Sequence, residues 1–396
     1  MLAGVLARVA TAVPPEVVTP EFVGSVASIN PFFTIVARSG GGKGASQGAA
    51  GSWFRVTNCL LRFTETTIGS GEGIAAAFAK PGKADDGTPI TEIHTDSALI
   101  DIAEVDTLGA IAGRSGSTTT SELRKAWDGA PLGFRNRTAE RSIIVPAHSY
   151  RMAVVMGVQP ERSGTLLDES AGGFPQRFVW FTASDPDAPA QPPAPLEPHE
   201  WTPPQVPARE DGKRVLKVCA TAATTITTAA VARLRGEGDA LDGHALLARL
   251  KIAALLALLD GKTGVNEEDW RLSGLVMEES DRVRQSCVDA LRDATQARSR
   301  ASAVLRGEAE VETDVRAADV AIAKVKERII KTIGTDSVAK GRIQAGLSRR
   351  LREYLDAALY DLEDDGQVII REEVYRGQRT ERISLIGSSA GQTANA

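Results

Sequence analysis

Four short runs of apolar residues, each bounded by glycine or polar residues, mark the first half of the chain. Runs of this length, rich in β-branched and aromatic residues, are typical of strands buried on both faces of a parallel sheet. Helix-compatible stretches separate them, which favours an α/β fold with a parallel central sheet. The predicted strands are Phe32–Val36, Ser97–Ala103, Tyr150–Val158 and Arg177–Thr182.

In the second half the apolar residues recur at helical spacing. Before it, the Pro- and Asp-rich segment 184–207 has no periodicity and predicts an extended linker. Asn266 is followed by three acids, as expected of a helix N-cap. The predicted helices are 215–234, 241–259, 266–300 and 308–332.

The N-terminal segment is apolar and ends at Pro14 and Pro15. It is faintly like a secretory signal, but it lacks a basic start and Arg8 interrupts it. A short amphipathic helix over 1–12 is therefore the preferred interpretation, with a loop over 17–30 that leads into the first strand. No apolar run is long enough to span a bilayer, so no membrane partner is expected.

The segment 334–385 shows a different order of elements: helix, helix, then a β-ribbon. This is the order of a winged helix, which binds DNA or protein. The predicted elements are helices at 338–343 and 349–363 and strands at 368–370 and 382–385, joined through Gly377.

Composition limits the classes of function. The chain has 396 residues, enough for two or three domains, and 42% apolar with 24% charged residues is ordinary for a globular protein. A net charge of -5 provides no general basic field, so nucleic acid would have to bind at local patches. Cys59, Cys219 and Cys287 fit neither a disulfide framework nor a metal site, which favours a reducing cytoplasm.

A glycine-rich loop with a lysine follows the first predicted strand. Strand, glycine loop, lysine and helix form the layout of a phosphate-binding loop, in which backbone N–H groups cradle phosphates and Lys43 reaches the β- and γ-phosphates of ATP. The alternative is an ordinary turn. The candidate nucleotide-binding residues of the loop are Ser39, Gly40, Gly41, Gly42, Lys43, Gly44, Ala45 and Ser46.

The loop departs from the consensus G-x-x-x-x-G-K-[ST] at two positions. Ala37 replaces the first glycine, and Gly44 stands where the magnesium-binding hydroxyl belongs. Ser46, or a water molecule, is the candidate replacement as a ligand of Mg²⁺. The Lys-Gly-x-Ser form resembles nucleotide kinases of the adenylate kinase type.

Acids follow the second predicted strand, as in a Walker B element. One carboxylate there would hold Mg²⁺ and another would polarise the attacking water. Glu104 and Asp106 are favoured for these two tasks, with Asp101 as the alternative, and the sequence does not divide the tasks between them.

Three further residues are candidates for the nucleotide site. Gln159 follows the third predicted strand, where it could sense the γ-phosphate or simply cap a loop. Arg177, at the start of the fourth strand, could project as an arginine finger into a neighbouring subunit, or be a plain surface residue. Arg249 lies in the predicted helix 241–259.

Two groups of arginines are candidate DNA contacts, because phosphate and groove contacts favour arginine. The first group is in a predicted β-hairpin around 135–141, and the second is near the start of the predicted helix 349–363. The residues are Arg135, Arg137, Arg141, Arg349, Arg350 and Arg352.

The motifs occur in a distinctive order: A-R-S-G-G-G-K-G, A-E-V-D-T-L, M-G-V-Q-P, G-G-F-P-Q-R-F-V-W, then D-G-H-A-L-L-A-R-L-K and V-N-E-E-D-W. This order resembles the ATPase part of primase–helicase-type replication proteins of actinobacteria, their phages and plasmids. The resemblance covers 1–300 and implies a P-loop ATPase of the RecA/AAA+ class. It also implies ATP and Mg²⁺ as cofactors, DNA as partner and a homo-oligomer, typically a hexameric ring, with a lid-like role for the stretch that carries Arg249.

The preferred hypothesis is an ATP-dependent DNA motor of the helicase type. The alternatives are a nucleotide or small-molecule kinase and a nucleotide-gated DNA-binding regulator without motor activity. The expected regions are an ATPase core at 1–183, a Pro-rich linker at 184–210, a helical lid and connector at 211–333, a winged helix at 334–386 and a disordered tail at 387–396.

Overall fold

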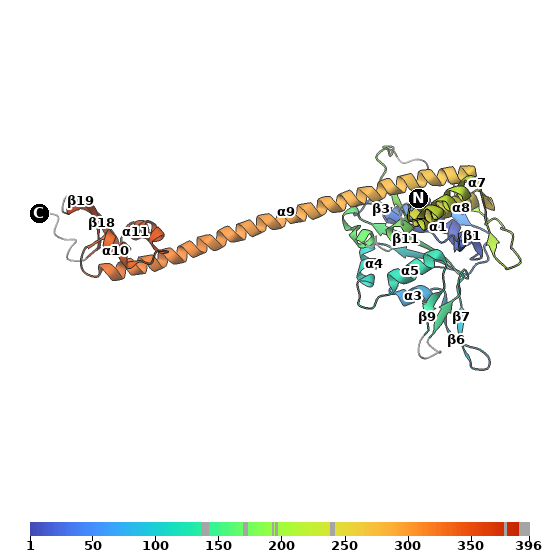
Figure 1. Cartoon of the computed structure of the whole chain (residues 1–396), viewed down its shortest axis with the longest axis horizontal. Coiled ribbons are helices and arrows are strands. Elements are labelled where there is room, and N and C mark those ends of the chain that lie inside the picture. The colour runs from blue at the N-terminus through green and yellow to red at the C-terminus, as the bar shows by residue number, and fades with distance from the viewer. Residues whose placement is uncertain are drawn as a thin grey trace. The chain divides into compact units, whose positions relative to one another are not determined.

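The structure is a computed structural model that describes residues 1–135, 142–168, 173–191, 194, 197–237, 242–375 and 378–387 (Figure 1). By their contacts the residues form two compact units, 1–295 and 296–396. The regions expected to be an ATPase core and a helical lid therefore share one unit, and the boundary falls inside the long helix α9 (Glu267–Ile333).

A five-stranded, all-parallel sheet forms the centre of the first unit. Its order is β12–β3–β11–β8–β5, so one strand, β11, lies between β3 and β8. The α/β class and the four predicted strands are confirmed. The strands are β3 (Phe32–Val36), β5 (Phe63–Thr66), β8 (Ser97–Ile102), β11 (Arg151–Val158) and β12 (Phe178–Thr182).

Helix α1 (Leu2–Ala12) packs against β8 and β11 in the core of this unit. The prediction of an amphipathic helix was wrong, because every residue of α1 except Leu2 and Arg8 is buried. Gly4 allows α1 to pack closely on the neighbouring helix α2 (Lys43–Trp53), because a Cβ at position 4 would lie 2.7 Å from the Cβ of Ala50.

A buried arginine joins α1 to the sheet. The Arg151 guanidinium, at the start of β11, donates hydrogen bonds to the carbonyls of Val13, Pro14, Pro15 and Val17 and to the hydroxyl of Ser28. Its burial lowers its pKa to about 9. The segment 13–17 therefore follows the end of helix α1 and also supplies hydrogen-bond acceptors for the Arg151 guanidinium.

The segment 17–30, predicted as a loop, is a β-hairpin, and so is the polar segment 79–93. Residues 17–30 form β1 (Val17–Val23) and β2 (Ser25–Ser28), which turn at Gly24 in the left-handed region. Residues 79–93 contain β6 (Ala79–Lys83) and β7 (Pro89–Ile93), which pair as antiparallel strands. In both, alternating exposed residues obscured the strand pattern.

The remaining elements of the first unit surround the sheet. The hairpin of β9 and β10 lies beside that of β6 and β7 (Figure 1). The helices are α3 (Gly71–Ala76), α4 (Val105–Ala112), α5 (Thr119–Asp128), α6 (Gly164–Leu167), α7 (Ala220–Leu234) and α8 (Asp242–Leu259). The short strands are β4 (Phe54–Val56), β9 (Leu132–Phe134), β10 (Ile143–Val145), β13 (His199–Trp201), β14 (Arg214–Val215), β15 (Lys217–Val218) and β16 (Gly264–Val265).

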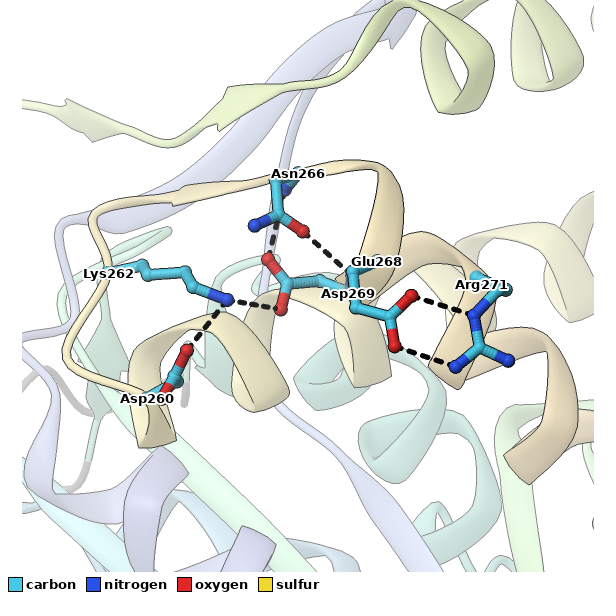
Figure 2. Close-up of polar contacts among 6 residues, drawn as sticks. All are labelled: Asp260, Lys262, Asn266, Glu268, Asp269 and Arg271. Carbon is cyan, nitrogen blue, oxygen red and sulfur yellow. Dashed lines mark hydrogen bonds and ion pairs between the residues drawn. The ribbon is translucent and has the colours of Figure 1, made fainter.

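Helix α9 begins with a reciprocal cap (Figure 2). The backbone N–H of Asp269 donates to the Asn266 side chain, and the Asp269 carboxylate accepts from the Asn266 backbone N–H, at 2.9 and 3.0 Å. Lys262 adds an ion pair to the buried Asp269 at 3.1 Å. The N-cap prediction is confirmed, but the two helices predicted beyond it are one continuous helix of 67 residues.

The second unit contains the end of α9 and a three-stranded sheet in the order β17–β19–β18. The segment predicted as helix from Val338 begins as a strand, and the helix predicted from Arg349 begins at Leu355. Its further elements are β17 (Val338–Ala339), α10 (Lys340–Gly346), α11 (Leu355–Asp364), β18 (Val368–Tyr375) and β19 (Gln378–Leu385).

None of the described helices combines the length and the apolar character that crossing a membrane would require.

Candidate functional site

The glycine-rich loop joins β3 to α2 at the carboxyl edge of the sheet. Gly40 and Gly42 have φ of 74° and 85°, a backbone conformation that side chains with a Cβ disfavour. Gly41 is needed for space, because a Cβ there would lie 2.8 Å from the Cβ of Ala37. The three glycines thus allow a tight, exposed turn that ends at the first residue of the helix, Lys43.

Lys43 turns back towards the acids that follow β8. Its Nζ lies 3.3 Å from Glu104 Oε1 and donates to the carbonyl of Ala37 at 3.2 Å. Gln159, which follows β11, donates from Nε2 to Glu104 Oε2 at 3.2 Å. Three residues from three separate segments of the sequence therefore meet, as expected for the carboxyl ends of neighbouring parallel strands.

A cavity of about 240 Å³ lies beside Lys43. Gly157, within β11, opens this space: a Cβ there would lie 2.0 Å from the carbonyl oxygen of Ala103 and 3.3 Å from Lys43 Cε. Sequence reasoning missed Gly157. The available signal was a glycine inside a buried strand, which often marks a close approach.

Asp101 also lines this cavity, from the end of β8 before the acids that the sequence analysis favoured. Its Oδ1 accepts a hydrogen bond of 3.0 Å from Gln47 Nε2, and Gln47 is itself part of the cavity wall. Asp101 and Glu104 therefore present two carboxylates to the cavity from the strand next to β11.

Asp106 points elsewhere. It lies in the first turn of α4 and forms an ion pair with Arg162, and it is not among the residues that line the cavity. The structure thus places Asp101, and not Asp106, on the wall of the cavity beside Lys43.

Ser46 is engaged in its own helix. Its Oγ donates to the carbonyl of Lys43 at 2.8 Å. Gly44 lines the cavity, and a Cβ at this position would meet nothing within 4 Å. Position 44, where the consensus has a hydroxyl-bearing residue, therefore has room for a side chain. Steric crowding does not explain why glycine stands there. Ser39 and Ala45 are exposed on the loop and on the first turn of α2.

Arg177 does not project from the strand start. Its side chain is 7% exposed, its Nη1 donates to the carbonyl of Gly173 at 2.9 Å, and its guanidinium lies 5.3 Å from the Trp127 ring centroid. Burial lowers its pKa. It precedes Phe178, which pairs with the first residue of β3, so it lies at the amino edge of the sheet, opposite Lys43.

Arg249 is held between two helices. Its guanidinium stacks 3.8 Å from the ring centroid of Trp270, and its Nη2 donates to the carbonyl of that residue at 2.9 Å. Burial lowers its pKa. These contacts fix α8 on α9 and do not direct Arg249 to the cavity beside Lys43.

The candidate DNA contacts are only partly described. The predicted hairpin is present as β9 and β10, and Arg135 is exposed just after β9. Arg137 and Arg141 lie outside the described residues. In the second unit, Arg349 and Arg350 are exposed in the turn before α11, and Arg352 donates from Nε to the carbonyl of Leu347 at 3.1 Å.

In comparisons with known proteins, no family model matches the chain and no curated protein is significantly similar to it. The geometry of the site therefore carries the functional argument.

Proposed function

We propose that the first unit is a P-loop ATPase of the RecA/AAA+ class and that the protein is an ATP-dependent DNA motor of the helicase type. One observation carries the proposal: Lys43, Asp101 and Glu104 line one cavity at the carboxyl edge of the parallel sheet, and Gln159 donates a hydrogen bond to Glu104. A cation, two acids and an amide around a glycine-rich turn are the groups that nucleotide hydrolysis requires.

The residues fit a bound nucleotide. The exposed turn before α2 would offer its backbone N–H groups to the phosphates, and Lys43 would compensate their charge. Lys43 is held by Glu104, so an arriving phosphate group would replace this carboxylate as its partner. The freed Glu104 would then face the terminal phosphate.

The donor set also fits Mg²⁺. This ion is usually held by one or two carboxylates together with the phosphates of the nucleotide. Asp101 provides such a carboxylate, which leaves Glu104 free to act on the attacking water. The described residues contain no group of three or more His, Cys, Asp or Glu side chains that could hold a metal ion. When bound, Mg²⁺ would neutralise charge on the phosphates.

The proposed role of Glu104 is to accept a proton from the attacking water. Gln159, at 3.2 Å from the carboxylate, would orient Glu104 and contact the terminal phosphate. Because a glutamine amide can donate and accept, it can remain engaged when the carboxylate moves.

The groups beside the cavity favour an ATPase over a kinase. Glu104 and Gln159, joined by a hydrogen bond of 3.2 Å, can position and deprotonate an attacking water. The kinase alternative rests on the Lys-Gly-x-Ser motif, 43–46.

An oligomer is part of the proposal. Lys43 is the one cationic residue among those lining the described cavity, so a second cation at the terminal phosphate would come from another copy of the chain. Ring-forming ATPases supply this cation across a subunit boundary. A hexameric ring is the arrangement that the resemblance implies.

The second unit is proposed to be a winged helix. The end of α9, β17, α10, α11 and the β18–β19 ribbon follow the order of that fold. DNA contact is proposed for Arg349 and Arg350 in the turn before α11. The exposed face of α11 itself contributes Asp356, Tyr360 and Glu363, which disfavours its entry into a DNA groove.

The test is ATP turnover of the full chain with and without single-stranded DNA, together with its mass in solution with and without ATP. The proposal predicts turnover that DNA stimulates and a larger assembly with ATP, both lost in Lys43→Ala. Phosphoryl transfer to a nucleoside monophosphate, without stimulation by DNA, would favour the kinase. ATP-dependent DNA binding without turnover would favour the regulator.

A further inference from the structure

A second cavity in the first unit, of about 380 Å³, lies among the β1–β2 hairpin, α7 and α8. It shares no lining residue with the cavity beside Lys43. Its volume is within the range of small-molecule sites, about 300–1,000 Å³. The wall is mainly apolar, with Ile226, Leu247 and Leu250 from the two helices and Phe22 from the hairpin.

On the described wall, one buried polar atom lacks a hydrogen-bond partner. Arg233, in the last turn of α7, has its Nη1 buried without a hydrogen-bond acceptor in the described part of the chain. Gly243 leaves room for the guanidinium, because a Cβ at this position would lie 3.2 Å from Arg233 Cζ. A buried N–H group without an acceptor is unfavourable, so the site lacks an acceptor that a ligand can supply.

Near the cavity, the described residues include more basic side chains than carboxylates. Lys251 is buried, with its Nζ 3.5 Å from the Trp127 ring centroid, and Arg177 lies over the same ring. Asp128 is the one carboxylate on the described wall, and it lies 3.9 Å from Arg177. Burial, and then the charge of Arg177, lower the pKa of His244, which lines the cavity.

We propose that this cavity binds a small organic anion, a carboxylate with an apolar body. The carboxylate accepts from Arg233, which matches its two oxygens with two N–H groups. The body packs against Ile226, Leu247 and Leu250. The site is separate from the proposed ATPase site, so it would be a place where a metabolite acts on the protein independently of nucleotide.

The experiment is calorimetric titration of the full chain with linear carboxylates from butanoate to decanoate, and with octanol as the neutral analogue. Affinity is expected to rise about threefold to fourfold for each added methylene until the cavity is full. Octanol is expected to bind at least about tenfold more weakly than octanoate, because it leaves the charge of Arg233 uncompensated.

Two variants and one matched control locate the site. Arg233→Gln is expected to weaken octanoate binding about tenfold or more, while Arg235→Gln, an exposed arginine two residues later, leaves it unchanged. Leu247→Trp fills the cavity and is expected to abolish binding even if Arg233→Gln fails to fold. Saturating ATP is expected to leave octanoate affinity unchanged.

Any of four results overturns the proposal: no carboxylate binds, octanol binds as tightly as octanoate, Leu247→Trp binds as the wild type does, or ATP competes with octanoate. Competition would assign the anion to the glycine loop. Because ATP turnover is measured separately, absence of octanoate binding together with normal turnover refutes this site alone.

Discussion

The two edges of the parallel sheet both hold buried or half-buried cations, but the partners of these cations differ. At the carboxyl edge, Lys43 faces a cavity and is paired with a carboxylate that a ligand can displace. At the amino edge, Lys251 donates to the main-chain carbonyls of Asn30 and Trp127, which are fixed in the fold. Displaceable partners beside a cavity indicate a binding role, whereas fixed carbonyl acceptors indicate a structural one.

Arg177 is a cation with a structural role, although its position in the sequence suggested a binding role. A strand start after two glycines is compatible with a projecting side chain, but the adjoining Trp127 and Asp128 cover the guanidinium. Tertiary contacts from residues about fifty positions earlier decide its role, and no local pattern reports them.

The largest effect is expected for Lys43→Ala. Without the ammonium group the phosphate charges are uncompensated, so ATP turnover should fall roughly 100-fold or more, as for the loss of a main electrostatic contact. The free energy of unfolding should change little, because Lys43 borders a cavity and its fixed acceptor is a single carbonyl. Turnover assays and thermal unfolding measure both. Unchanged turnover would refute the phosphate loop.

The pair Asp101→Asn and Asp106→Asn tests which acid serves the site. Asp101→Asn should lower turnover about 10- to 100-fold and raise the Mg²⁺ concentration needed for half-maximal rate, since neutral oxygens bind the ion less well. Asp106→Asn should change turnover less than about threefold, because its partner is Arg162 at the surface. The reverse order would restore the role that the sequence favoured.

Mixing two inactive variants distinguishes a structural role of Arg177 from a role in the nucleotide site of a neighbouring subunit. If Arg177 is structural, Arg177→Ala should lose stability, by roughly 1–3 kcal/mol from unpaired buried acceptors. Adding Lys43→Ala subunits should then restore no turnover. Recovery in mixed assemblies would show that Arg177 acts across a subunit boundary, as the sequence suggested.

The smallest effect is expected for the contribution of Lys251 to the pH dependence of stability. Burial holds the pKa of Lys251 well below that of a free lysine. The unfolded chain keeps this proton up to about pH 10.5, while the folded chain releases it earlier, so this residue makes stability rise with pH between those two pKa values. Lys251→Met should lose this slope. Denaturant unfolding at several pH values, with Lys324→Met as an exposed control, measures it.

The central strands could be predicted because a continuous apolar run of five to nine residues between glycines and polar residues fits a strand buried on both faces. The glycine loop and the region of the acids could be placed as well, since strand ends and glycines are local features. Gly157 was not identified, and Asp101 was named only as the alternative to the favoured acids, because their places at the cavity depend on how closely β11 and β8 approach the loop. The hairpins at 17–28 and 79–93 were missed, since their strands are short and half exposed.

The continuity of helix α9 could not be predicted from the sequence. The small and charged residues around Gly307 weaken the apolar pattern, so the sequence suggested two helices there. Ion pairs one turn apart, such as Glu312 with Arg316, stabilise an exposed helix without an apolar face.

The central claim is that a phosphate group replaces Glu104 as the partner of Lys43. The most direct measurement is the equilibrium affinity of Glu104→Gln for Mg·ATP, compared with the wild type under conditions that prevent turnover. The neutral amide holds Lys43 less strongly, so the account predicts binding at least as tight as in the wild type, with hydrolysis slowed about 100-fold or more. Weaker binding at unchanged hydrolysis would contradict it.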